Sequence, residues 1–118
     1  MKRDANPIRD MVAIAGAAST GFIASNGSRS RASLAAEACV AVLRACGVER
    51  STVDGLCGSA PTAPVLQEML GLGNITWFAN PPTPFINQVV TAVQAVHAGT
   101  CDLVLAYHSS YRLPWNTP

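Results

Sequence analysis

Residues 80–108 constrain the fold more than any other stretch of the sequence. Prolines at positions 81, 82 and 84 cannot continue a strand ladder, because proline lacks the N–H donor, but their fixed φ suits the first turn of a helix. We therefore expect a helix that begins near Pro84 and ends at Gly99, where glycine can adopt the left-handed conformation. The apolar run 103–106 then predicts a strand. Because this helix is apolar over a wide surface, we expect it to be buried on most sides.

Four polar side chains interrupt the same helix: Asn87, Gln88, Gln94 and His97. On a buried helix each of them needs a hydrogen-bond partner. They either tie the helix to the loops around it, or they face a neighbouring subunit, a domain or a pocket.

The remaining chain contains alternating strand and helix patterns. Strands are expected over residues 11–18, 53–57 and 75–79, and the Gly- and Ser-rich stretch 19–33 predicts a long loop. A helix capped by Ser30 or Ser33 should end at Gly47, and a short amphipathic helix should cover 65–72. The order β-α-β-α-β-α-β predicts an α/β fold, with a parallel or mixed sheet, right-handed crossovers and helices on both faces.

Composition limits the class of protein. With 118 residues, the chain can form one domain with one core, and 49% hydrophobic against 13% charged residues leaves a surface that should need a partner. A net charge of +1 without a large basic cluster argues against nucleic-acid binding. No apolar run approaches the ~20 residues that span a bilayer, and no signal-peptide pattern is present. We expect a cytoplasmic protein whose first ten residues are flexible.

The four cysteines, Cys39, Cys46, Cys57 and Cys101, do not form a CxxC pair. Cys39 and Cys46 lie seven residues apart on one predicted helix, about 10 Å of rise, which is too far for a disulfide. Each cysteine lies in or beside an apolar segment, so buried thiols in a reducing compartment are expected, with no metal site.

Two segments could carry chemistry at the ends of strands. The glycines at positions 16 and 21 follow the first predicted strand, but the spacing matches neither a dinucleotide fingerprint nor a phosphate-binding loop. Cys57 ends the second strand ahead of a helix, where a thiolate could be stabilised, and His108 should lie at the same edge of a parallel sheet. The alternative is that Cys57 is a small residue filling a strand exit.

The chain resembles the N-terminal domain of the thiolase superfamily. The segment that carries most of this resemblance is residues 98–107, AGTCDLVLAY, which is similar to the end of the third helix and the following strand of that domain. Residues 12–16, the helix that starts with LAAEA at 34–38, and Val53, Asp54 and Gly55 fit the same family in order. The sequence looks most similar to the lipid-transfer branch, which includes acetyl-CoA acetyltransferases and aldolases of steroid side-chain degradation.

This resemblance implies an incomplete thiolase-fold domain over residues 1–118, acting on acyl-CoA thioesters when complete. Active thiolases carry a nucleophilic cysteine at the start of the third helix, and Pro82 occupies about that position here. The aldolase branch also lacks this cysteine. The family's general bases lie in a C-terminal domain, so these 118 residues alone should be inactive, without a cofactor and with the CoA thioester as substrate. The remaining catalytic candidates are Cys57, Tyr107 and His108.

The resemblance also implies an interface. In thiolase-like dimers the third strand pairs across the two-fold axis, which would place Ile75, Trp77 and Phe78 between subunits. The expected partners are an acyl-CoA substrate and either a second copy or an acyl-CoA-binding protein. Two other hypotheses remain open: a non-catalytic assembly module that presents the 80–99 segment to a partner, and a Cys57-based hydrolase or transferase.

Overall fold

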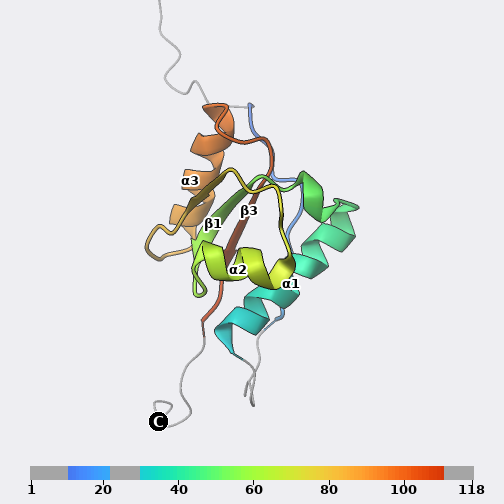
Figure 1. Cartoon of the computed structure of the whole chain (residues 1–118). Coiled ribbons are helices and arrows are strands. Elements are labelled where there is room, and N and C mark those ends of the chain that lie inside the picture. The colour runs from blue at the N-terminus through green and yellow to red at the C-terminus, as the bar shows by residue number, and fades with distance from the viewer. Residues whose placement is uncertain (1–10, 22–29, 111–118) are drawn as a thin grey trace, which may run out of the picture.

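The computed structural model describes residues 11–21 and 30–110, and within them three parallel strands form a sheet (Figure 1). The strands are β1 (Gly55–Ser59), β2 (Trp77–Ala79) and β3 (Val104–His108), in the spatial order β2-β1-β3. In register, Cys57 lies opposite Ala79 on one side and Ala106 on the other. The predicted α/β class with a parallel sheet is confirmed.

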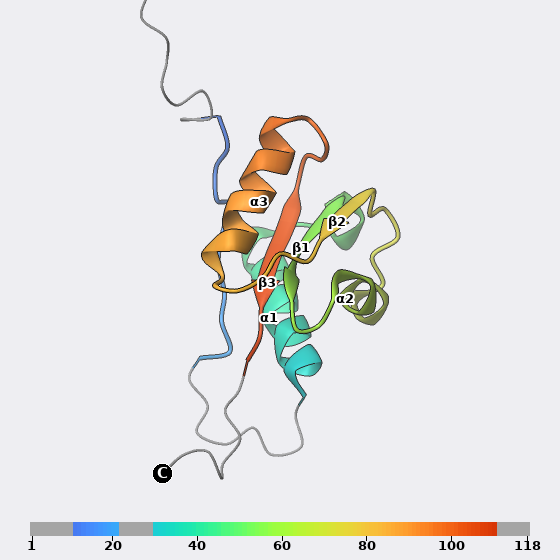
Figure 2. The ribbon, with the colours of Figure 1, turned by 90° about the vertical axis from the view of Figure 1, so that its left-hand side faces the viewer.

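Helices cover both faces of the sheet. The helices are α1 (Arg31–Cys46), α2 (Ala63–Leu70) and α3 (Ile86–His97), and a short 3₁₀ helix (Arg50–Thr52) precedes β1. Figures 1 and 2 show α3 on one face, with α1 and α2 on the other. Each helix connects two parallel strands or precedes the first one, so the layers follow from the order of elements along the chain. No helix in the described ranges is long and apolar enough to cross a membrane.

Local signals set the helix ends. Ser30 is the N-cap of α1, and its hydroxyl accepts a hydrogen bond from the Ser33 amide at 3.0 Å. Gly47 and Gly71 follow α1 and α2 with φ of 65° and 66°, in the left-handed region that glycine adopts without strain. The third helix begins at Ile86, two residues after the predicted start at Pro84, because Pro84 and Phe85 form a turn that precedes it.

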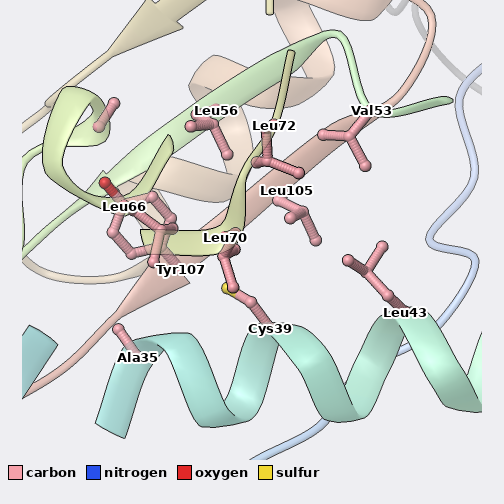
Figure 3. Close-up of a cluster of buried hydrophobic side chains, with 11 residues drawn as sticks. Ala35, Cys39, Leu43, Val53, Leu56, Leu66, Leu70, Leu72, Leu105 and Tyr107 are labelled. Atoms are coloured by element: carbon pink, nitrogen blue, oxygen red, sulfur yellow. The ribbon is translucent and has the colours of Figure 1, made fainter. Parts of the chain in front are cut away.

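The main core lies between the sheet and the α1/α2 layer, and Figure 3 shows its side chains gathered above α1. Successive strand residues point to opposite faces, so Leu56 of β1 and Leu105 and Tyr107 of β3 share this side. The buried cluster consists of Ala35, Cys39, Leu43, Val53, Leu56, Ala63, Leu66, Leu70, Leu72, Leu105 and Tyr107.

The opposite face of the sheet packs against α3 through smaller side chains. The buried residues of α3 are Gln88, Ala92 and Ala95, spaced as one face of a helix. The Cys57 thiol donates to the Gln88 carbonyl at 3.3 Å, a contact that requires a close approach of helix and strand. The helix is therefore buried on one face, whereas Ile86 and Val90 are 59% and 46% exposed. The expectation of burial on most sides is wrong for the described part of the chain.

The first predicted strand is not part of the sheet. Residues 11–21 have no regular secondary structure, and Met11 and Ile14 are 67% and 76% exposed. The segment lies against the end of α1, where the Cys46 thiol donates to the Ala15 carbonyl at 3.5 Å. Its β-prone composition is not sufficient, because a strand needs a neighbouring backbone to complete its hydrogen bonds. The predicted flexible N-terminus, residues 1–10, and residues 22–29 of the predicted loop lie outside the described residues.

Candidate active site

A polar cluster lies where β1 and β3 end. Ser59 and His108 are the last residues of these neighbouring strands and are directly in register. The Ser59 hydroxyl oxygen lies 3.0 Å from Nδ1 of His108. Ser59 is partly buried and His108 is exposed, so small molecules can reach this pair. In parallel α/β sheets, ligands bind outside the carboxyl ends of the strands, which is the edge that Ser59 and His108 occupy.

Gln88 extends the cluster from the helix side. Its side chain is fully buried at the start of α3, and its Nε2 donates to the Pro81 carbonyl at 2.8 Å and to the Ser59 hydroxyl at 3.4 Å. Its Oε1 is buried and has no hydrogen-bond partner within the described residues. Reversing the amide would aim the oxygen at the Pro81 carbonyl, so the geometry fixes the side chain as a donor toward Ser59. We call Ser59, Gln88 and His108 the carboxyl-end cluster.

The backbone that follows Ser59 turns sharply toward α2. Ala60 has φ of 53°, in the left-handed region where a non-glycine residue is strained. The Tyr107 hydroxyl donates to the Pro61 carbonyl at 2.8 Å, and the Asn80 side chain accepts from the Ala63 amide at 2.9 Å. These contacts fix the turn against both β3 and the loop that follows β2. Such strain is typical of functional sites, where the surrounding structure has to maintain it.

The surroundings of Cys57 and Tyr107 do not suit catalysis by a nucleophile or a general base. Cys57 is fully buried, and burial, followed by the charge of nearby Cys101, raises the pKa of its thiol to about 11. The Cys57 thiol donates to the Gln88 carbonyl, whereas His108 contacts Ser59. Burial also raises the pKa of Tyr107 above its ordinary value, and its hydroxyl is occupied at Pro61. Both geometries favour structural roles.

Pro82 lies in the loop that leads into α3, where its carbonyl accepts from the Asn87 side chain at 2.9 Å. It is exposed and has no nucleophilic group. The correspondence of Pro82 to the thiolase nucleophile stays a prediction.

The predicted interface residues lie at one edge of the sheet. Within the described chain, β2 pairs with β1 alone, so its other edge carries unpaired backbone groups. Phe78 is 49% exposed, Trp77 is partly buried, and Ile75 packs against the main core. The described residues contain no group of three or more His, Cys, Asp or Glu side chains that could hold a metal ion.

Comparison with known proteins yields a structural neighbour. No protein-family model matches the sequence, and no curated protein matches it. Among solved structures, a chain of "Ltp2-ChsH2(DUF35) aldolase" is similar, with 28% sequence identity and a TM-score of 0.58. The match covers 67% of this chain and 22% of that chain. This protein is therefore similar in fold and sequence to part of an aldolase, and it spans about a fifth of that aldolase's length.

The sequence predicts that His108 lies at the same edge of the sheet as Cys57 and leaves open whether the two meet; the structure places His108 beside Ser59. Alternation and register along β1 determine this pairing. Cys57 and Ser59 point to the same face of the sheet, and Ser59 is the residue in register with His108. Gln88 was recognised as a polar residue that needs a partner. The identity of that partner depends on how α3 crosses the sheet, which no sequence pattern specifies.

Proposed function

We propose that these residues contribute an α/β unit to a cytoplasmic, thiolase-like aldolase of the lipid-transfer type, which acts on acyl-CoA thioesters. The observation that carries this proposal is the similarity to the aldolase chain in both sequence and fold. The order of elements and the resemblance of residues 98–107 to the thiolase N-terminal domain agree with it.

The reaction proposed for the complete protein is retro-aldol cleavage beside a CoA thioester. Such a reaction needs a base that removes a proton from the 3-hydroxyl group and donors that stabilise the enolate formed when the carbon–carbon bond breaks. Acyl transfer by a thiolase mechanism is less well supported, because Pro82 offers no thiol near the start of α3. The match covers about a fifth of the neighbour's chain, so we expect no turnover from these 118 residues alone.

Two exposed surfaces support association with a partner. The outward side of α3 carries Ile86 and Val90, and Phe85 beside it is 44% exposed. The open edge of β2, with Phe78, lies at the side of the sheet. The proposed partners are a second copy of the chain or an acyl-CoA-binding protein, and the neighbour's name likewise joins two components, Ltp2 and ChsH2(DUF35). If turnover is absent from every assembly, these surfaces favour the alternative function, a non-catalytic assembly subunit.

Turnover tests the proposal directly. The chain is incubated with a 3-hydroxyacyl-CoA, alone and together with a DUF35-type partner, and mass spectrometry follows release of the shortened acyl-CoA. We expect none from the chain alone, and release when a longer product of the same coding frame, read past Pro118, is used with the partner. The assembly role would be favoured by two results together: a coding frame that encodes no second α/β domain past Pro118, and a stable oligomer that never turns over substrate.

A further inference from the structure

In the carboxyl-end cluster, hydrogen-bond donors and acceptors follow one another from Gln88 to Ser59 to His108. A contact that only linked the two strand ends would not need this arrangement. The Gln88 amide can only donate through Nε2, so the Ser59 oxygen accepts from it at 3.4 Å. The serine hydroxyl can also donate its own hydrogen, and Nδ1 of His108, at 3.0 Å, accepts it when the histidine carries its proton on Nε2. In that tautomer of His108 the hydrogen bonds run in one direction, from Gln88 through Ser59 to His108.

We propose that Ser59 is a nucleophile, that His108 is its general base, and that the pair accepts an acyl group from an activated ester or thioester. The distance of 3.0 Å lies within the range in which a base can activate a hydroxyl nucleophile. The Gln88 donor stabilises the negative charge that develops on the Ser59 oxygen as its proton leaves. This activity goes beyond the proposed aldol chemistry, which requires no acyl-serine.

The surroundings favour reactivity over a simple link between strand ends. Gln88 is completely buried, and its Oε1 has no hydrogen-bond partner among the residues that the structure describes. This costly arrangement aims one Nε2 hydrogen at Pro81 and the other at Ser59. The strained turn at Ala60 directs the chain away from Ser59 immediately after it. His108 is exposed, so its Nε2 and the serine can be approached from solvent.

Ser59 Oγ bonds to the carbonyl carbon of a thioester while its proton moves to Nδ1 of His108. The carbon–sulfur bond breaks, and the leaving thiolate takes the proton from His108, which yields an acyl-serine and a free thiol. Water then attacks the ester: His108 takes one proton from the water and returns it to Ser59, so the products are a carboxylic acid and the regenerated hydroxyl.

The experiment uses the full 118-residue chain and a biotinylated fluorophosphonate as the probe. The fluorophosphonate should lose fluoride and attach to Ser59, as located by peptide mass spectrometry, and Ser59→Ala should abolish this adduct. His108→Gln should slow the labelling by at least about 100-fold, the usual contribution of a general base. Ser110→Ala, an exposed serine beyond the end of β3, is the matched control and should label at the wild-type rate.

Circular dichroism confirms that each variant is folded before it is compared. No adduct on Ser59 in the folded wild-type chain, or an equal labelling rate in His108→Gln, would overturn the proposal. Labelling does not depend on CoA binding or on carbon–carbon cleavage. Loss of aldol turnover with intact labelling therefore contradicts the aldolase function and not the serine–histidine pair.

Discussion

Replacing Gly58 by alanine tests the packing that holds the carboxyl end of the sheet together. A Cβ built at Gly58 overlaps the Tyr107 carbonyl oxygen and lies 2.6 and 2.7 Å from two carbons of its ring. These distances are well inside van der Waals contact. The strand cannot move aside, because β1 is paired on both edges and covered by helices on both faces.

The expected cost follows from this geometry. Overfilling a packed interior typically costs about 1–3 kcal/mol, and we expect the upper end, about 3 kcal/mol, because part of the obstacle is the main chain of β3 rather than a flexible side chain. With a urea m-value of ~1–3 kcal/mol/M, the unfolding midpoint should fall by about 1–3 M. Urea titration followed by far-UV circular dichroism measures this shift.

Gly73 provides the matched control. A Cβ at this position meets no atom within 4 Å, and its φ lies outside the left-handed region. Gly73→Ala should leave the midpoint unchanged or raise stability by ~0.4–1 kcal/mol through a less flexible unfolded chain. Equal midpoints for Gly58→Ala and Gly73→Ala would refute the argument, because the close contact with Tyr107 would then have no energetic consequence.

Three further predictions concern other parts of the chain. Asp54→Ala should lower stability by about 1.5–3 kcal/mol in the same titration, since its carboxylate accepts from the Asp102 and Leu103 amides, whereas Asp102→Ala should change little. Burial raises the pKa of Cys39 and Cys57 from 9.0 to about 11, so their contribution to stability is complete below pH 9 and is lost as pH rises toward 11, which urea midpoints across that window would reveal. Phe78→Lys should reduce self-association in sedimentation experiments, because a charged edge opposes strand pairing.

Short-range signals account for most of the fold. Gly47 ends α1 as expected, and Ser30 is one of the two predicted caps. The predicted helix over 65–72 is present as α2, which ends at Leu70 ahead of Gly71. The second and third predicted strands are present with shifted bounds, because periodicity defines an element better than its ends. The strand prediction for residues 11–18 is wrong for a different reason. The β-prone residues there give the segment a preference for extended backbone, but strand pairing also requires a neighbour at the open edge of the sheet.

The candidate site could be predicted only in part, and the reason is geometric. The sequence places His108 at the end of one strand and Cys57 near the end of another, but its spacing does not require the thiol and the imidazole to meet. Register instead puts Ser59 beside His108, two residues farther along the same face as Cys57.

The same helix decides the roles of both β1 residues. The main chain of α3 accepts the Cys57 thiol and keeps it buried, while the Gln88 side chain donates to Ser59 at the strand end. If Cys57 rather than Ser59 were to act as the nucleophile, α3 would have to shift along the sheet to uncover the thiol. Because Gln88 is also held at Pro81, such a shift would break the contact that fixes the loop before α3. The structure therefore assigns reactivity to the strand end and stability to the thiol beneath the helix, and selective labelling of Ser59 over Cys57 is its consequence.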